Sequence, residues 1–186
     1  MNKVKFTKDD LQAAASKIIS DVIDFELSVL FCGINPGLYS GVTGHHFARP
    51  GNRFWKTLHA AGFTPRQFAP SEELELIKLG YGITNVASRI TARADELTIE
   101  EIIAGGARLK EKVLHFRPKF LAVLGIGAYR TAFDRPKAVL GLQTDKIGET
   151  RLWVLPNPSG LNANYQLNDL ARVYGELQRE AMTFNK

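Results

Sequence analysis

The sequence has few of the features that mark secreted, metal-cluster or membrane proteins. Its 186 residues contain one cysteine, Cys32, which excludes a disulfide within the chain and any four-cysteine metal or iron–sulfur site. Cys32 lies in an apolar, strand-like run, where a cysteine is more often a small buried hydrophobe than a nucleophile. No apolar run approaches the roughly 18 residues of a membrane span, and the opening MNKVKFTKDD turns acidic too early for a signal peptide. We therefore expect a cytoplasmic protein without membrane contact.

Motifs of several common enzyme classes are also missing. The segment GLYSGVTGHH lacks the Gly-Lys-Ser/Thr ending of a P-loop, and LGIGAY lacks the third glycine of a dinucleotide-binding fingerprint. Ser159 is not part of a G-x-S-x-G nucleophile elbow, and no carboxylate pair stands out for glycosidase-type acid–base catalysis. His45 and His46 are adjacent but have no further ligand nearby, so we interpret them as loop histidines close to a phosphate. We expect no metal and no cofactor.

The charge balance favours a polyanionic partner without establishing one. Lysine and arginine outnumber aspartate and glutamate by 24 to 19, which gives a formal net charge of +5, and the pI is about 9.4. Such a balance suits nucleic acid, although many basic enzymes never bind it.

Apolar runs alternate with amphipathic segments along the chain, with no internal repeat, low-complexity tract or clear linker. Short continuous apolar runs such as LSVLFCG are typical of strands buried on both faces, and their alternation with helices indicates an α/β domain with a mainly parallel sheet. We expect helices over 7–23, 52–62, 71–80, 98–116 and 165–182, and strand–turn units within 27–37, 119–133 and 151–160. We expect one domain, 1–186, in which residues 1–25 form an N-terminal helical extension.

Local capping signals support several of these helices. Thr7 is a candidate N-cap, followed by two aspartates in the first helical turn. Asn52 is a candidate N-cap for the second helix, and Thr98 with Glu101 forms a capping box for the fourth. Glycine destabilises helix interiors, so the Gly105–Gly106 pair is expected to kink or divide that helix.

Two strand ends carry the same kind of turn. GINPG (33–37) and NPSGL (157–161) each place Asn-Pro and then glycine just past an apolar strand. Proline holds the preceding asparagine extended, and glycine lets another molecule approach the backbone. The asparagine amide donates and accepts hydrogen bonds without charge, so it can orient a water or a polar base edge. An ordinary turn explains either motif alone, but two of them at the carboxyl ends of strands favour a ligand site.

An aromatic and basic segment, TGHHFARPGNRFW (43–55), lies between the two turns. Aromatic rings can stack on bases, and Arg49 and Arg53 could meet phosphates. Phe54 and Trp55 fall within an expected helix and are better explained as core residues. Phe47 lies in the preceding loop, which makes it the better stacking candidate.

In this order, the motifs closely resemble those of the bacterial mismatch-specific uracil-DNA glycosylases, relatives of thymine-DNA glycosylase in the uracil-DNA glycosylase superfamily. The similarity runs from about Ser28 to about Leu177 and includes GITNVASR, AGGARLKEK, LAVLGIGAY and WVLPNPSGL. The N-terminal helix falls outside it. The resemblance implies a three-layer α/β/α sandwich around a short, mainly parallel sheet. It also implies an enzyme that flips deoxyuridine out of duplex DNA and hydrolyses its N-glycosidic bond.

The resemblance assigns roles to residues of the first turn and the aromatic loop. Asn35 would position the attacking water, and Phe47 would stack on the flipped base. The backbone around Ile34 and Asn35 would bond the edge of the base, and Ser40 would lie near the uracil 5-position. The chemistry agrees, because an oxocarbenium-like transition state needs a positioned water more than a strong base.

The second turn would serve both the substrate and the opposite strand. By the resemblance, Asn157 and Ser159 are substrate-binding residues. Gly160, Leu161 and Asn162 would form the wedge that fills the vacated stack and touches the opposite guanine. The expected partner is therefore duplex DNA with a G·U mismatch or a related lesion, bound by a monomer.

Some positions depart from the family pattern. After Leu161 the chain reads NANYQ, where some relatives carry a basic residue, so Asn162 or Asn164 takes over part of that contact or the contact is lost. Asn85 occupies a position that varies among relatives. Neither turn has the acidic residue or the histidine of the faster branches, so a high excision rate is not expected.

Two other functions remain open from the sequence. One is a mismatch-binding module with negligible catalysis, which would share the wedge and the basic surface. The other is a nucleotide-binding α/β enzyme that acts on a small molecule. Product formation on a G·U duplex separates the first from a glycosylase, and salt-sensitive duplex binding argues against the second.

Overall fold

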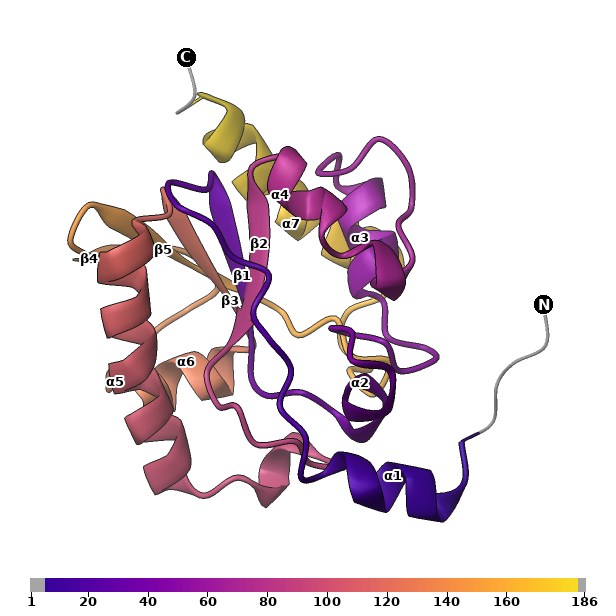
Figure 1. Ribbon diagram of the computed structural model, residues 1–186. Coiled ribbons are helices and arrows are strands. Elements are labelled where there is room, and N and C mark those ends of the chain that lie inside the picture. The colour runs from indigo at the N-terminus through magenta and orange to yellow at the C-terminus, as the bar shows by residue number, and fades with distance from the viewer. Residues whose placement is uncertain (1–5, 184–186) are drawn as a thin grey trace.

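The computed structural model describes residues 6–183 and places a five-stranded sheet between two layers of helices (Figure 1). The strands are β1 (Val29–Gly33), β2 (Tyr81–Asn85), β3 (Phe120–Leu124), β4 (Gly141–Ile147) and β5 (Thr150–Leu155). Their order is β2-β1-β3-β5-β4. Strands β2, β1, β3 and β5 pair in parallel, and β4 pairs antiparallel to β5. The predicted α/β fold with a mainly parallel sheet is confirmed.

The helices cover both faces of the sheet. They are α1 (Lys8–Ala14), α2 (Leu38–Thr43), α3 (Phe54–Ala60), α4 (Glu75–Lys78), α5 (Ile99–Phe116), α6 (Ile126–Phe133) and α7 (Leu167–Thr183), with short 3-10 turns at Pro70–Glu72 and Ala94–Glu96. One apolar cluster packs α3, α4 and α7 against one face, and a second packs α5 and α6 against the other. Within residues 6–183, no helix is both long enough and apolar enough to cross a bilayer.

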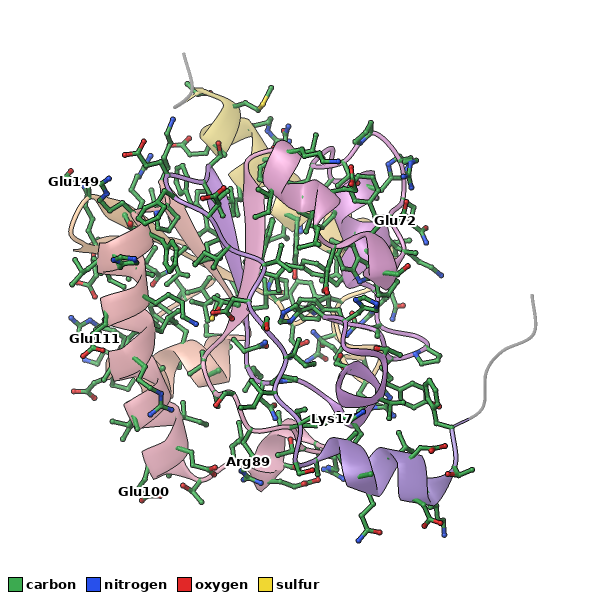
Figure 2. The ribbon with its side chains drawn as sticks, in the orientation of Figure 1. Lys17, Glu72, Arg89, Glu100, Glu111 and Glu149 are labelled. Carbon is green, nitrogen blue, oxygen red and sulfur yellow. The ribbon has the colours of Figure 1, made fainter. Side chains whose placement is uncertain are left out.

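Alternate residues of β1 show how the sheet divides the core. Phe31 is fully buried on the α3 side and makes edge-to-face contacts with Phe54 and Phe63, with ring centroids 5.6 and 5.1 Å apart. Its neighbour Cys32 is buried on the α5 side, and this burial raises the pKa of the thiol. Charged side chains such as Glu111 lie on the outside (Figure 2). The expectation that Cys32 is a buried hydrophobe is confirmed.

Two strands were not predicted from the sequence. Strand β2 begins directly after Gly80, and its apolar run, YGIT, is too short to indicate a strand by itself. β4 is an edge strand whose first six residues alternate between half-buried and exposed before the buried Ile147, so it lacks a continuous apolar run. Its antiparallel pairing with β5 depends on the turn at Gly148, which has a φ of 56°.

The first expected helix is shorter than predicted. Thr7 and Asp10 form a capping box and α1 begins as expected, but it ends at Ala14 rather than near residue 23. The reason is tertiary, because Val22 forms an antiparallel bridge with Ile83 of β2, with N–H to O distances of 2.9 and 2.7 Å. An extended residue at that position is incompatible with a continuing helix.

The other helix predictions need smaller corrections. The expected helix over 71–80 divides into the 3-10 turn at Pro70–Glu72 and the four-residue α4. Asn52 caps α3 from outside, since its Oδ1 accepts a hydrogen bond from the Phe54 amide at 2.9 Å. The capping box of α5 is confirmed, with Thr98 and Glu101 bonded reciprocally.

The predicted kink at Gly105–Gly106 is wrong, because α5 runs unbroken for 18 residues. The glycines instead let the helix approach two backbone segments closely. A Cβ at Gly105 would lie 2.3 Å from the Val86 carbonyl oxygen, and one at Gly106 would lie 2.2 Å from that of Ala132. The pair therefore sets the distance between α5, α6 and the segment after β2.

Substituting Gly106 tests whether this close approach outweighs helix propensity. Gly106→Ala should lower the free energy of unfolding by roughly 1–3 kcal/mol, because the added methyl group must displace backbone. Gly127→Ala in α6 is the control, since a Cβ there has no neighbour within 4 Å. The control should be neutral or stabilising by up to about 1 kcal/mol. Denaturant unfolding measures both, and equal stability of the two variants would contradict the packing argument.

Candidate functional site

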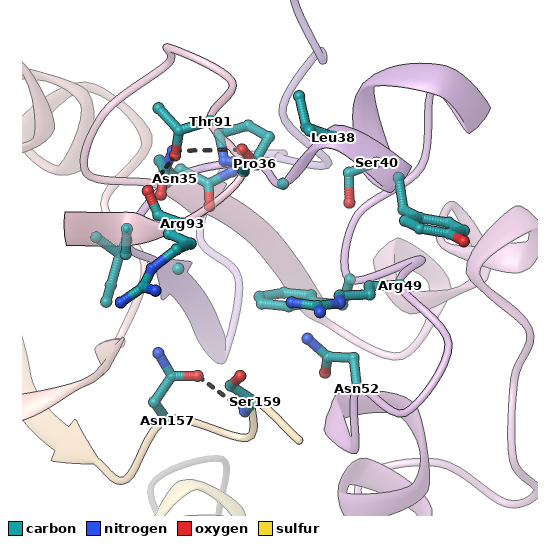
Figure 3. A pocket seen from close by; sticks show the side chains of 18 of the residues that line it. Asn35, Pro36, Leu38, Ser40, Arg49, Asn52, Thr91, Arg93, Asn157 and Ser159 are labelled. Carbon is teal, nitrogen blue, oxygen red and sulfur yellow. Dashed lines mark hydrogen bonds between the residues drawn. The ribbon is translucent and has the colours of Figure 1, made fainter. Parts of the chain in front are cut away.

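A cavity of about 510 Å³ lies at the carboxyl ends of the parallel strands, next to α2 (Figure 3). Residues 33–40 after β1, Asn85 at the end of β2, residues 91–95 and the second turn line it. In a parallel sheet these ends share one edge, so segments far apart in sequence meet there. The two Asn-Pro turns therefore face one cavity: Asn35 and Thr91 lie on one side and Asn157 and Ser159 on the other (Figure 3).

The Asn35 amide is held in one orientation. Its Nδ2 donates to Thr91 Oγ1 at 2.7 Å and to the Arg89 carbonyl at 2.8 Å, with a longer contact to the Pro36 carbonyl at 3.3 Å. The Thr91 hydroxyl donates its own proton to the Arg93 carbonyl at 2.7 Å, so it can only accept from Asn35. The amide nitrogen is thus committed to the protein. No group within residues 6–183 donates a hydrogen bond to Asn35 Oδ1, so that oxygen can serve a ligand or water.

Phe47 is held in a strained conformation at the cavity wall. Its φ of 53° lies in the left-handed region, which is rare for a bulky residue and typical of functional sites. The ring stacks on Phe54, with centroids 4.0 Å apart and planes 25° from parallel. A Cβ at Gly33 would lie 3.2 Å from Phe47 Cζ and 2.4 Å from Asn85 Oδ1, so a glycine is needed beneath them. Phe54 and Trp55 are buried core residues, as expected.

Ser40 and Ile34 also lie at the cavity. Ser40 is nearly buried, lines the cavity from α2 and accepts a hydrogen bond from the Ala48 amide at 3.4 Å. The Ile34 carbonyl accepts from the Ala87 amide at 2.9 Å, which fixes the backbone between β1 and Asn35.

Both histidines bond to groups of the protein, and His46 also lines the cavity, while their closeness to a phosphate stays a prediction. His46 is buried, with its ring Nε2 3.0 Å from the Ser20 carbonyl oxygen, and its backbone amide donates to Glu73 at 2.7 Å. His45 Nδ1 lies 3.0 Å from the same carboxylate. Both histidines are engaged within the protein because the buried Glu73 carboxylate needs hydrogen-bond partners. In the described residues no group of three or more His, Cys, Asp or Glu side chains could hold a metal ion.

The second turn is braced by its own side chains. Asn157 Oδ1 accepts from the Ser159 amide at 2.9 Å, and Ser159 Oγ accepts from the Leu161 amide at 3.2 Å. Asn162 Nδ2 donates to the Asn157 carbonyl at 2.9 Å, while its Oδ1 accepts from the Asn164 amide at 3.2 Å. Asn162 is therefore committed inside the turn, and the suggestion that it replaces a basic DNA contact is not supported by this geometry.

The turn forms a ridge that ends in an exposed apolar side chain. Leu161 is 72% exposed and borders both the main cavity and a smaller one of about 260 Å³. Gly160 packs so closely on the aromatic loop that a Cβ there would lie 2.6 Å from the Gly51 carbonyl oxygen. An exposed leucine on a braced turn is suited to enter an apolar space in a partner.

Arg53 holds this turn from the start of α3. Its guanidinium donates to the carbonyl oxygens of Pro158, Ser159, Asn162 and Tyr165. Its backbone amide also donates to the Pro158 carbonyl, at 3.0 Å. The expectation that Arg53 meets phosphates is therefore wrong, because the fork of guanidinium donors is used on converging carbonyls.

Two other arginines lie at the cavity mouth. Arg49 and Arg93 reach over it from different sides (Figure 3). Arg93 forms an ion pair with Asp95 at 2.5 Å. Arg49 is exposed and makes no ion pair with any residue of the described range. Asn85 and Arg93 line the cavity but were not predicted as site residues from the sequence. The available signal for Asn85 was that it is a third asparagine at the end of a strand.

The fold and the site define a class of α/β protein that binds its ligand at the carboxyl edge of a parallel sheet, between two asparagine-bearing turns. The family model described as the uracil DNA glycosylase superfamily matches residues 20–178. The chain therefore belongs to the uracil DNA glycosylase superfamily, and membership supports a DNA glycosylase activity in general.

A solved structure agrees at the level of the fold. It is a solution NMR structure from Methanosarcina acetivorans, described as a candidate uracil DNA glycosylase. The TM-score is 0.57 and the sequences are 22% identical, with 87% of this chain and 98% of the other covered. Helix α1 precedes the segment that the family model matches.

Replacing Arg53 tests its role independently of any activity. In Arg53→Gln, hydrogen exchange at the amides of Ser159, Leu161 and Asn162 should accelerate about 10- to 100-fold, since hydrogen bonds to a charged group contribute roughly 1.5–3 kcal/mol. Arg66→Gln is the control, because Arg66 is exposed and pairs with Glu72 far from the turn. Unchanged exchange in the Arg53 variant would show that the turn is rigid without it.

Proposed function

We propose that this protein is a monofunctional DNA glycosylase that removes uracil from duplex DNA, preferably from G·U mismatches. The observation that carries the proposal is the Asn35 amide, whose nitrogen is bound by Thr91 and whose oxygen is left for a water at the cavity. An amide fixed in this way acts by positioning, which can supply a large part of a catalytic effect.

The proposed reaction is hydrolysis at the sugar C1′ atom. The bond from C1′ to the uracil nitrogen breaks first, the base leaves with the bonding electrons, and the sugar becomes an oxocarbenium-like cation. The water held by Asn35 Oδ1 then forms the new bond from its oxygen to C1′ and loses a proton to solvent. Because the cation is strongly electrophilic, a neutral asparagine is sufficient to orient the water.

The cavity offers contacts for a flipped uracil. The Phe47 ring, supported by Phe54, would stack on the face of the base, a contact worth roughly 1–3 kcal/mol per base. The backbone around Ile34 and the amide of Asn157 would bond the base edge, and Ser40 would lie near its 5-position. Hydrogen bonds to the uracil oxygens would stabilise the negative charge on the departing base.

The second turn would keep the duplex open. Leu161 would fill the space that the flipped base leaves, and the backbone from Ser159 to Asn162 would face the opposite guanine. Arg53 and the internal hydrogen bonds of the turn support this role, because a turn that is already ordered loses less entropy on insertion. Arg49 would supply positive charge beside the turn, and the protein would act as a monomer.

The first test of the function is Asn35→Ala. Single-turnover excision of uracil from a G·U duplex should fall by about 10²-fold or more, the usual scale for losing one key catalytic group. Duplex binding should change little, because both turns remain. Asn168→Ala, which changes an exposed asparagine in the first turn of α7 away from the cavity, is the control and should keep the wild-type rate.

Three results would count against this assignment. Near-normal cleavage by Asn35→Ala would remove Asn35 from the mechanism. Binding to G·U duplex without product in the wild type would favour a mismatch-binding module. Absence of salt-sensitive duplex binding would favour an enzyme acting on a small molecule.

The second test concerns Leu161 and the opposite base. The wild type should excise uracil faster from G·U than from A·U, because a wobble pair is easier to open. The difference in activation free energy should lie within the few kcal/mol that unstacking costs. Leu161→Ala should slow excision from duplex G·U about 10-fold, since burying a leucine side chain contributes roughly 1.5–3 kcal/mol. Excision from single-stranded DNA should be unaffected, because no gap needs filling.

The control for this comparison is Leu74→Ala, which removes a leucine of similar exposure, 68% against 72%, away from the cavity. It should leave the duplex and single-strand rates unchanged. Equal wild-type rates on G·U and A·U, with no selective duplex defect in Leu161→Ala, would refute the wedge.

A further inference from the structure

A buried carboxylate lies behind the aromatic loop and outside the cavity. Glu73, between the 3-10 turn at Pro70–Glu72 and α4, is 7% exposed, yet it is not among the residues that line the cavity. Its Oε2 accepts the His46 backbone amide at 2.7 Å, and its Oε1 lies 3.0 Å from His45 Nδ1. A carboxylate so buried must be hydrogen-bonded, and it binds the two residues immediately before Phe47.

Further contacts of His46 complete a clamp, and its ring Nδ1 also lies 3.4 Å from Asn85 Nδ2. The His46 ring Nε2 lies 3.0 Å from the Ser20 carbonyl oxygen, and the His46 carbonyl accepts from Trp55 Nε1 at 3.1 Å. The amide, the carbonyl and the ring of His46 are thus each held by a different segment. Only the amide is held by a charged group, and charge-assisted hydrogen bonds are the stronger ones.

The clamp accounts for the conformation of the next residue. Phe47 has a φ of 53°, a left-handed backbone that persists only where the surroundings over-determine it. A change in the Phe47 backbone dihedrals would move its ring off Phe54, on which it stacks with ring centroids 4.0 Å apart. The position of the ring at the cavity therefore depends on how firmly His45 and His46 are held.

We propose that Glu73 is a positioning residue which, through His45 and His46, holds Phe47 in place to stack on the flipped base. The inference rests on the proposed function, because that function supplies the flipped base on which Phe47 stacks. Glu73 does not border the cavity, so it acts through the loop and not on the reacting atoms.

A double-mutant cycle between Glu73 and Phe47 tests this coupling. Single-turnover excision is measured for the wild type, Glu73→Ala, Phe47→Ala and the double variant. Glu73→Ala should slow excision roughly 10- to 100-fold, the scale for misplacing a substrate-positioning group. In the Phe47→Ala background the same change should have almost no further effect, because the ring that it positions is already gone.

Two more variants separate positioning from general stability. Glu73→Gln keeps an oxygen that accepts the His46 amide and should retain most of the rate. Glu75→Ala removes a nearby, partly exposed carboxylate that pairs with Lys78 and should retain the full rate. Melting temperatures are measured throughout, and if Glu73→Ala does not fold, His45→Ala replaces it in the cycle. A purely structural role would slow excision equally in both backgrounds, and that additive result would overturn the proposal.

A second readout does not depend on catalysis. Ring-to-ring NMR contacts between Phe47 and Phe54 should be strong in the wild type, weaker in Glu73→Ala and preserved in Glu73→Gln. If the wild type makes no product, the proposed function fails, and these contacts still decide whether Glu73 positions the ring. Unchanged contacts in Glu73→Ala would overturn the inference even in an active enzyme.

Discussion

The stacking of Phe47 on Phe54 links the cavity to the core of the protein. Phe54 in turn packs edge-to-face on Phe31 in the central strand β1, so three rings connect the sheet to the cavity wall. A surface supported in this way cannot shift without disturbing the packing beneath it, because protein interiors are close-packed. The strained backbone of Phe47 is stable only on this foundation.

The N-cap and the first two residues of α3 serve three parts of the site at once. Arg53 holds the second turn, Phe54 supports the Phe47 ring, and the Trp55 indole binds the His46 carbonyl. Successive helical residues point about 100° apart, so three neighbours can reach three different segments. The relative placement of the aromatic loop and the second turn is therefore set by one short stretch of chain.

The features that local sequence determines were predictable. Thr7 and Thr98 cap their helices because a hydroxyl three residues before a carboxylate is a local signal, and Asn35 faces a cavity because the strand before it is apolar and parallel. Features that depend on distant partners were not predictable in the same way. The sequence around Arg53 is typical of a phosphate ligand, because the carbonyls that it binds belong to a turn more than 100 residues away. The predicted first helix was too long because Ile83, which pairs with Val22, lies far from it in sequence.

The same limit applied to Glu73 and to the edge strand β4. Nothing in the segment around Glu73 distinguishes it from its half-buried neighbours Glu72 and Glu75, and its burial comes from the loop that folds over it. β4 carries half-buried and exposed residues in alternation, a pattern too weak to recognise without its partner strand. Sequence motifs located the cavity, while its supports came from tertiary contacts.

Cys32 has a consequence for the chemistry of the whole protein. Its sulfur is buried in the central sheet, and because burial raises the pKa of the thiol, the reactive thiolate is suppressed in the folded state. Thiol reagents and oxidants therefore reach Cys32 through opened forms of the chain. As the chain has one cysteine, the rate of its alkylation reports how often the centre of the sheet opens, so the protein carries its own probe of unfolding.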